Sequence, residues 1–211
     1  MTICLQLDHV NYSYGAAKIR VLSDVNADFE SGKMYAITGP SGAGKSTLLS
    51  LLAGLDAPSD GVVRFEGEDI VTTGYSRHRR EHVSLVFQDH NLIDYLTPEE
   101  NLRLVNPKAD MKILEDLGLS REESKRNIMH LSGGQRQRVA VGRALVAPGR
   151  AILADEPTGS LDPEMTDEVI DLLRHAAHQL GKCVIVVTHS KRVADSADAV
   201  YTLRHKKLAK A

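Results

Sequence analysis

Long apolar runs are missing from this chain of 211 residues. No stretch approaches the roughly 20 consecutive apolar residues that a membrane-spanning helix needs. The N-terminal segment MTICLQLDHV also lacks the basic start and the apolar run of a signal peptide. We therefore expect any role at a membrane to depend on another chain.

Cysteine and excess charge are also scarce. The two cysteines, Cys4 and Cys183, lie far apart in apolar, β-branched stretches, which favours buried thiols over a metal site or a disulfide. Charged residues make up 26% of the chain, but the formal net charge is only -2, so no basic excess indicates binding to nucleic acid. Repeats, low-complexity tracts and long linkers are absent too, and one domain covering residues 1–211 is expected.

Apolar patterning predicts two kinds of sheet. Alternation in ICLQLDHV and in the stretch up to DVNADF indicates antiparallel strands, with a turn at Tyr14 and Gly15. Short, almost wholly apolar segments, typical of strands covered on both faces, follow at MYAIT (34–38), VSLVF (83–87), AILAD (151–155) and CVIVVT (183–188). Helical segments separate these strands, so we expect an α/β fold with a mainly parallel central sheet and an N-terminal antiparallel β-subdomain.

The strand-like runs stop after the segment VFQ. The segment TPEEN predicts a helix that Thr97 caps, with Pro98 in its first turn and Glu100 three residues after the cap. KADMKILEDLG (108–118) predicts another helix, and its last residue, a glycine, is a typical end. We therefore predict a small helical subdomain at about residues 89–145, inserted in the core.

Three further polar segments have simple structural interpretations. DPEMTDEVIDLLRHAAHQLG carries apolar residues at helical spacing, from a start at Asp162 and Pro163 to a stop at Gly181. The basic tail HKKLAKA (205–211) is predicted to be a frayed, solvated end. The two histidines of SRHRREH (76–82) are predicted to lie on a solvated, charged face.

The segment GPSGAGKST predicts a phosphate-binding loop. It fits the pattern G-x-x-x-x-G-K-[ST] and lies between the strand MYAIT and an apolar helix. Backbone N–H groups of such a loop turn toward phosphate oxygens, Lys45 would reach the outer phosphates, and the Ser46 hydroxyl would ligate Mg²⁺. A glycine turn that merely joins a strand to a helix is the alternative, which the adjacent lysine and serine disfavour. The predicted nucleotide-binding residues of this loop are Gly39, Pro40, Ser41, Gly42, Ala43, Gly44, Lys45, Ser46 and Thr47.

Polar residues at the ends of two other buried strands complete a predicted hydrolytic site. ILADEP puts Asp155 and Glu156 at the carboxyl end of a strand, where ligands bind in open α/β sheets. Asp155 would hold Mg²⁺, and Glu156 would polarise the attacking water as general base. A loop start is the ordinary interpretation of such a pair, but a phosphate loop in the same chain favours the functional one. His189, which follows CVIVVT, would contact the γ-phosphate and orient the water, although a lone histidine there is more often structural.

Gln88 directly follows the strand VSLVF. Alone, it would be one of many surface glutamines. At a strand end beside the predicted Mg²⁺ site, its side chain would contact the metal and the water, and it also opens the helical subdomain. We therefore predict that Gln88 is both a ligand and a hinge.

A second glycine-rich stretch, LSGGQ (131–135), precedes the apolar-periodic segment RQRVAVGRALVA. Ser132 would cap a helix whose first N–H groups are free and whose dipole favours an anion, so Gly133, Gly134 and Gln135 join the predicted nucleotide-binding residues. A glycine cap of an ordinary helix is the alternative. Because the two loops lie on different subdomains, we expect this loop to serve a nucleotide held by a second copy of the chain.

The motifs GPSGAGKST, VFQ, LSGGQRQR, ILADEPTGSLD and VVTHS, in this order, resemble the nucleotide-binding subunit of ATP-binding cassette (ABC) transporters. The resemblance covers nearly the whole chain, and the five motifs together are highly specific. It implies a RecA-like P-loop NTPase core that binds ATP and Mg²⁺ and hydrolyses ATP. It also implies a head-to-tail homodimer, with each ATP between the phosphate loop of one subunit and residues 132–135 of the other. In this arrangement Asp162, in SLD, would couple the two sites, and Tyr14 would stack on adenine, with Tyr12 as a less favoured substitute.

A finer resemblance concerns VFQDHNLIDYLTPEENL and ADEPTGSLD. They are similar to the branch that drives lipoprotein, macrolide and antimicrobial-peptide exporters and the related cell-division ATPases. This branch implies an integral membrane permease as partner at the cytoplasmic face of the cell membrane, allows an extracytoplasmic adaptor, and works by export or mechanotransmission. The stretch between Gln88 and Ser132 departs from the branch because it is shorter than usual.

Two other functions compete with transport. A soluble ABC-type ATPase that acts on ribosomes or DNA usually carries two cassettes in one chain or a long coiled-coil insertion, and this chain has neither. A regulatory nucleotide-binding module without catalysis would show a replaced Lys45 or Glu156, and both residues are present. We therefore expect a transport ATPase without a nucleic-acid partner.

Overall fold

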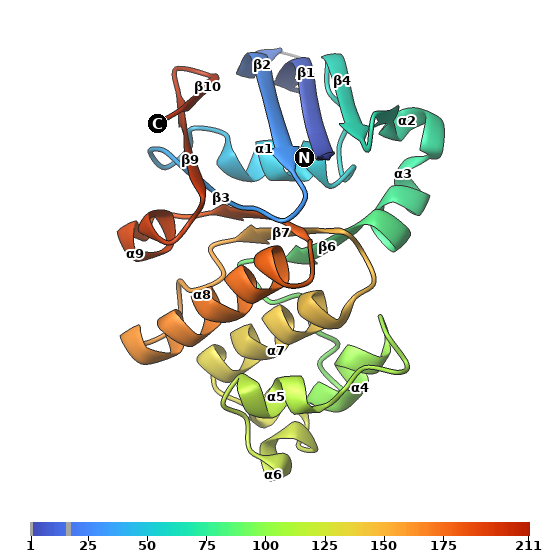
Figure 1. Cartoon of the computed structure of the whole chain (residues 1–211), viewed down its shortest axis with the longest axis vertical. Helices are drawn as coiled ribbons and strands as arrows, with labels where there is room; N and C mark the ends of the chain where they lie inside the picture. Colours follow the sequence, from blue (N-terminus) through green and yellow to red (C-terminus); the bar gives the residue numbers. More distant parts are fainter. Residues whose placement is uncertain (1, 16–17) are drawn as a thin grey trace.

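The antiparallel sheet predicted at the start of the chain is present (Figure 1). In the computed structural model, which describes residues 2–15 and 18–211, its strand order is β2-β1-β4-β5. β1 (Ile3–Tyr14) and β2 (Ile19–Glu30) form a long antiparallel pair, and β4 (Asp60–Phe65) and β5 (Glu68–Asp69) extend the sheet beyond β1. After β1, Gly15 adopts a φ of 63°, as the predicted turn requires.

The central sheet has six strands in the order β10-β9-β3-β8-β7-β6. Its strands β3 (Met34–Thr38), β6 (Val83–Val86), β7 (Ala151–Asp155) and β8 (Cys183–Val187) correspond to the four predicted apolar segments. Their pairings β3–β8, β8–β7 and β7–β6 are all parallel. The predicted α/β fold, with a mainly parallel central sheet and an antiparallel N-terminal sheet, is therefore confirmed.

The basic tail belongs to this sheet, so the prediction of a frayed end is wrong. β9 (Ala199–Arg204) runs parallel to β3, and β10 (Lys207–Lys210) turns back antiparallel to β9. The Lys206 carbonyl also accepts a hydrogen bond from the Ser23 N–H at 2.8 Å. β10 forms a hairpin with the preceding strand β9, and contacts with β3 and Ser23, which are distant in the sequence, hold this hairpin in place. The polar composition of the tail could not indicate these contacts.

Side chains cover both faces of the central sheet. Because successive side chains of a strand point to opposite faces, Ile185 of β8 joins a core with the antiparallel sheet and α1 (Lys45–Leu52), while Val186 joins a second core with α7 (Gly133–Val146) and α8 (Pro163–His178). Each fully buried aliphatic side chain stabilises the fold by roughly 1.5–3 kcal/mol. Burial on two faces therefore holds the parallel strands in register.

The two cysteines are buried and free, as predicted. Cys4 and Cys183 belong to the same apolar core, one in β1 and the other in β8. They take part in packing the antiparallel sheet against the central one. The structure therefore supports the interpretation of both residues as structural thiols.

The segment between β6 and α7 is helical, as predicted. α4 (Pro98–Arg103) begins with a capping box, in which the Thr97 hydroxyl accepts the Glu100 N–H at 3.2 Å and the Glu100 carboxylate accepts the Thr97 N–H at 2.8 Å. α6 (Arg121–Ser124) and a 3₁₀ turn, η2 (Ile128–His130), lead to α7. The extent of the subdomain at about residues 89–145 stays a prediction.

The second predicted helix of this segment is shorter than expected. α5 covers only Lys112–Asp116. Before it, the Asn106 side chain accepts the N–H of Lys108 at 3.0 Å and the Asp110 side chain accepts the N–H of Lys112 at 2.9 Å. Such contacts between an Asn or Asp side chain and the backbone two residues later stabilise turns and compete with helix.

Short helices connect the remaining strands. α2 (Ile70–Thr73), α3 (Tyr75–Arg77) and a single π-helical turn, η1 (His78–His82), lie between β5 and β6, and α9 (Lys191–Asp195) precedes β9. None of the helices in the described part of the chain combines the length and the apolar character that a membrane crossing requires.

The prediction that the histidines of η1 are solvated is wrong for His78. This side chain is 0% exposed, and its Nε2 atom lies 2.9 Å from the Leu52 carbonyl, to which it donates a hydrogen bond. The His82 ring stacks on Phe65 with ring centroids 4.2 Å apart. The π-helical turn aims one face of a charged segment at the core, which no local pattern in the sequence indicates.

We expect the free energy of unfolding to fall as the pH drops below about 6.5, partly because of His78. Burial lowers the pKa of His78 from its ordinary value of 6.5, so in this window the unfolded chain binds a proton that the folded chain excludes. The contribution of His78 to the free energy of unfolding is fully present above pH 6.5. It is lost as the pH falls through the pKa that His78 has in the folded chain. Urea unfolding of His78→Gln should show a flatter pH dependence.

The pH dependence is compared with that of the control His175→Gln, which removes an imidazole that is exposed in the folded chain. An unchanged pH dependence in His78→Gln would contradict the assignment.

Candidate functional site

The carboxyl ends of three neighbouring parallel strands meet at one cavity. β3, β8 and β7 are adjacent in the sheet, and predicted functional residues lie at the carboxyl end of each strand or within two residues after it. The cavity has a volume of about 580 Å³. Of the predicted residues, its lining contains Tyr14, Ser41, Gly42, Gly44, Lys45, Ser46, Thr47, Gln88, Asp155, Glu156 and His189.

Two positions of the phosphate loop require glycine. Gly44 is the N-cap of α1 with a φ of 101°, and a Cβ there would lie 2.5 Å from Cγ1 of Val21. Gly39 has a φ of 150°, and a Cβ there would lie 2.4 Å from the Leu203 carbonyl oxygen. No other residue type fits such contacts in this backbone conformation. Gly39, Pro40 and Ala43 shape the loop without lining the cavity.

Lys45 presents a buried positive charge at the cavity. Its side chain is only 6% exposed. Its Nζ atom donates to the carbonyls of Gly39 at 3.0 Å and Pro40 at 3.1 Å, and lies 3.2 Å from His189 Nε2. A buried ammonium group needs such partners, and phosphate oxygens satisfy the same requirement.

Glu156 is held in an unusual conformation. Its φ is 48°, a left-handed value that costs a non-glycine residue about 1–2 kcal/mol, and its N–H donates to the Val187 carbonyl at 3.0 Å. Thr188 Oγ1 donates to Glu156 Oε2 at 3.4 Å. The other oxygen, Oε1, is buried without a hydrogen-bond partner in the described structure and lies 3.7 Å from His189 Nε2. One carboxylate oxygen is thus positioned while the other remains free to accept a proton.

Tyr14 and Tyr12 differ in their availability. Tyr14 is 49% exposed, lines the cavity, and its hydroxyl lies 2.8 Å from Thr47 Oγ1. Tyr12 is 6% exposed, and its hydroxyl donates to Asp56, which raises the pKa of Tyr12 to about 12. The two rings make an edge-to-face contact with centroids 4.9 Å apart. Of the two tyrosines, Tyr14 lines the cavity and Tyr12 does not, which supports the preference for Tyr14.

The second predicted phosphate loop does not line this cavity. Ser132 caps α7, because its hydroxyl accepts the Gln135 N–H at 3.2 Å while Gln135 Oε1 accepts the Ser132 N–H at 2.8 Å. Asp162 caps α8 by accepting the Met165 N–H at 2.9 Å. Besides Gly39, Pro40 and Ala43 of the first loop, the predicted residues that the structure leaves outside the cavity are Ser132, Gly133, Gly134, Gln135 and Asp162.

The predicted metal ligands share the cavity. Ser46, Gln88 and Asp155 bring a hydroxyl, an amide and a carboxylate to its wall. Across residues 2–15 and 18–211, no group of three or more His, Cys, Asp or Glu side chains could hold a metal ion. One carboxylate with neutral oxygen donors fits Mg²⁺, which retains waters and phosphate oxygens as further ligands, and does not fit zinc.

Two residues at this site are not among those predicted from the sequence. Val21 lines the cavity next to Gly44, and no sequence signal indicates it, because β2 meets the loop only in the folded chain. Thr188 is fully buried between Glu156 and the N–H of Ser190, which it accepts at 3.0 Å. The one sequence signal that could have indicated Thr188 was its position directly before His189.

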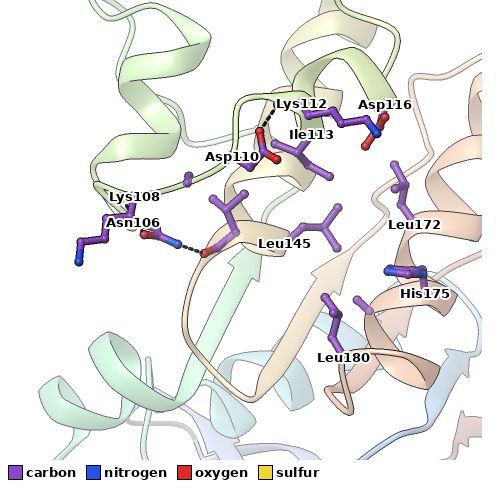
Figure 2. A pocket seen from close by; sticks show the side chains of 13 residues that line it. Asn106, Lys108, Asp110, Lys112, Ile113, Asp116, Leu145, Leu172, His175 and Leu180 are labelled. Carbon is purple, nitrogen blue, oxygen red and sulfur yellow. Dashed lines mark hydrogen bonds between the residues drawn. The ribbon is translucent and has the colours of Figure 1, made fainter.

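A larger cavity of about 640 Å³ lies elsewhere, between α7, α8 and the segment before α5 (Figure 2). Leu145, Leu172 and Leu180 line it from the two long helices and the turn after α8, and Lys108 and Lys112 lie at its other side. It contains no glycine loop and no residue from the end of a central strand. We therefore assign phosphate chemistry to the smaller cavity.

Comparison with known proteins agrees with this geometry. The family model for ABC transporters matches residues 22–159. An uncharacterized ABC transporter ATP-binding protein of Bacillus subtilis, YclH, is 37% identical in an alignment of 204 positions that covers 92% of this chain and 90% of YclH. The macrolide export ATP-binding/permease protein MacB of Escherichia coli is 38% identical in an alignment of 219 positions that covers 97% of this chain but 34% of MacB. The chain therefore spans about a third of the length of MacB.

Solved structures show the same architecture. The dimeric bacterial ABC transporter cassette MJ0796 superposes with a TM-score of 0.89 at 32% identity, covering 98% of both chains. A second dimeric structure of MJ0796, in a post-hydrolysis state bound to ADP and Pi, has a TM-score of 0.84. The likeness thus extends over both sheets and the helical segment.

Gly44→Ala is expected to lower both the melting temperature and the affinity for ATP. The substitution adds about 1–2 kcal/mol of left-handed backbone strain and a Cβ that contacts Val21 Cγ1. Adding Val21→Ala removes that contact and should restore part of both losses. Calorimetry and titration with a fluorescent ATP analogue measure the two effects.

Gly42→Ala is the matched control, because Gly42 has a φ of 73° but nothing within 4 Å of an added Cβ. The two alanine variants could instead lose melting temperature and ATP affinity equally, with neither quantity recovering when Val21→Ala is added to Gly44→Ala. That result would show that packing against Val21 does not require glycine at position 44.

Proposed function

Because the chain belongs to the ABC transporter family and is one of its ATP-hydrolysing cassettes, we propose that it drives a separate membrane permease from the cytoplasmic face of the cell membrane. ATP binding closes a head-to-tail homodimer, and hydrolysis reopens it. The motion then passes through the helical segment to the permease.

One observation carries this proposal: of the two predicted phosphate loops, only the first lines the cavity that Glu156 shares. The helix that Ser132 caps starts with Gly133 and Gly134, whose N–H groups lie outside the capping box, and its dipole favours an anion. In a head-to-tail dimer, each such loop reaches the nucleotide of the other subunit. The dimeric structures of MJ0796, at 32% identity, support this arrangement.

The contacts in the cavity suggest how hydrolysis proceeds. Lys45 binds the outer phosphates of ATP, and His189, which lies between Lys45 and Glu156, contacts the γ-phosphate. Glu156 Oε1 accepts a proton from the attacking water as the water oxygen bonds to the γ-phosphorus. The bond from the γ-phosphorus to the bridging oxygen breaks, and ADP and phosphate are released. Thr188 keeps the other carboxylate oxygen in place.

Ser46, Gln88 and Asp155 would hold Mg²⁺ in this cavity. When bound, the ion supplies positive charge that stabilises the phosphate oxygens. Gln88 also begins the loop that leads to α4, so its contact at the cavity couples the bound nucleotide to the helical segment. Tyr14 stacks on the adenine ring, and Asp162 contributes to the coupling between the two sites of the dimer.

A third cavity, of about 390 Å³, suits the permease. It lies beside the loop after Gln88, between β6 and α7, and its charged lining residues are Arg79, Arg80 and Arg143, without a carboxylate. Next to them, Leu104 is 59% exposed. A permease helix that combines acidic and apolar side chains fits this lining through charge and hydrophobic contact.

The comparisons favour export or mechanotransmission as the work performed. MacB, named as a macrolide export protein with an ATP-binding and a permease part, matches 97% of this chain at 38% identity. YclH, an ATP-binding protein of nearly the same length, supports a cassette that acts with a separate permease. An extracytoplasmic adaptor is a further component of this proposal. The competing role on ribosomes or DNA has no support, because these relatives are transporter proteins.

Glu156→Gln is expected to reduce ATP hydrolysis by a factor of about 10²–10⁴ and to accumulate an ATP-bound dimer, because the amide cannot accept the proton of water. Phosphate release and analytical ultracentrifugation with ATP and Mg²⁺ measure the two effects. Asp162→Asn is a useful comparison, since it alters a carboxylate outside the cavity. Undiminished hydrolysis in Glu156→Gln would show that another group is the base.

Tagged Glu156→Gln protein, purified from its native membranes with ATP, should carry a permease that mass spectrometry identifies. The same protein with Leu104→Asp should keep the ATP-bound dimer but lose the permease, because the new charge repels an acidic helix. Ribosomal or DNA-repair proteins without any membrane partner would overturn the transporter proposal.

A further inference from the structure

Two capping boxes lie side by side in the helical segment. At α6, the Ser120 hydroxyl accepts the Glu123 N–H at 3.2 Å, and Glu123 Oε2 accepts the Ser120 N–H at 2.8 Å. At α7, Ser132 and Gln135 exchange the same pair of hydrogen bonds. Each box satisfies backbone N–H groups that a helix start otherwise leaves free.

A direct hydrogen bond joins the two boxes. Gln135 Nε2 donates to Glu123 Oε1 at 2.6 Å, and the contact is partly buried. Both oxygens of Glu123 are therefore engaged, one by Ser120 and one by Gln135. Both polar atoms of Gln135 are engaged as well, because its Oε1 atom accepts the Ser132 N–H. The hydrogen bonds form one continuous network from Ser120 to Ser132.

We propose that Glu123 is a positioning residue for the second phosphate loop. Its carboxylate fixes the Gln135 amide, which in turn orients Ser132 at the start of α7, and this geometry sets how tightly the loop closes on the nucleotide of the other subunit. The proposal rests on the dimer described above. It gives Gln135 a role within its own subunit, because its Oε1 atom and one N–H of its Nε2 atom are already engaged there, which leaves only the second N–H of Nε2 for a phosphate.

The charge of Glu123 matters for this role. An ionised carboxylate accepts from two donors at once, and hydrogen bonds to a charged acceptor are about twice as strong as those between neutral groups. The Ser120 N–H lowers the pKa of Glu123, which keeps it ionised near neutral pH. Glu122 is different, because its side chain is 85% exposed and contacts Arg126 at 2.9 Å. The network therefore depends on one particular carboxylate of α6.

The sharpest variant is Glu123→Gln in the Glu156→Gln background. Glutamine has nearly the size of glutamate, and its carbonyl oxygen can still accept the Ser120 N–H. Its –NH₂ group would then face the –NH₂ group of Gln135, so two donors would meet where Glu123 offers an acceptor. We expect ATP-induced dimerisation to weaken by about tenfold, as for the loss of a charge-assisted hydrogen bond. The affinity of the monomer for a fluorescent ATP analogue should stay unchanged, because the first phosphate loop is untouched.

The double variant Glu123→Gln/Gln135→Glu exchanges the two side chains and restores their hydrogen bond with donor and acceptor reversed. The amide introduced at position 123 would then donate to the carboxylate introduced at position 135, which still accepts the Ser132 N–H. Dimerisation should therefore return to within about threefold of the parent. If position 135 instead contacts the phosphates directly, the new carboxylate repels them, and the double variant dimerises more weakly than Glu123→Gln alone. That result would overturn the proposal.

Two controls separate positioning from folding. Ser120→Ala removes the cap of α6 but keeps the contact between Glu123 and Gln135, so it should lower the melting temperature without weakening the dimer. Glu122→Gln should change neither quantity. Full dimerisation of Glu123→Gln would overturn the role of Glu123 but not the proposed function. Failure of the Glu156→Gln parent to dimerise would overturn both the proposed function and this inference.

Discussion

The parallel order β3-β8-β7 is the constraint on which the functional site depends. Parallel strands end at the same edge of a sheet, so the phosphate loop, His189 and Glu156 meet there although they are far apart in the sequence. Apolar side chains cover both faces of these strands and hold their register. A slip of one residue would turn every side chain of a strand to the wrong face, and the contact between Lys45 and His189 would be lost.

The same rigid core supports groups that are unfavourable on their own. Glu156 has a left-handed backbone and one buried carboxylate oxygen without a partner in the described chain, and Lys45 is a buried ammonium group. Each costs free energy that the two apolar cores offset. Such groups gather where phosphate, metal and water would bind, and they are the ones that the proposed hydrolytic mechanism uses. The two apolar cores therefore allow the site to keep its reactive groups in place.

Helix capping links local stability to function in the helical segment. Capping boxes begin α4, α6 and α7, and all satisfy free N–H groups in the same way. At α4 the box only starts a helix. At α7 the same chemistry shapes a loop that would bind phosphate, and the contact between Gln135 and Glu123 extends the network to a neighbouring helix. The hydrogen bond between Gln135 and Glu123 therefore distinguishes the capping box of α7 from the box of α4, which only starts a helix.

The sequence by itself determined the local features of this protein. The buried strands, the caps at Thr97, Ser132 and Asp162, and the phosphate loop follow from short-range patterns, because their physical causes lie within a few residues. The tertiary structure alone decided the burial of His78, the ordering of the tail in β10, the availability of Tyr14 rather than Tyr12, and the contact between Glu123 and Gln135. Each of these depends on which distant segment packs against the residue, and no local pattern carries that information.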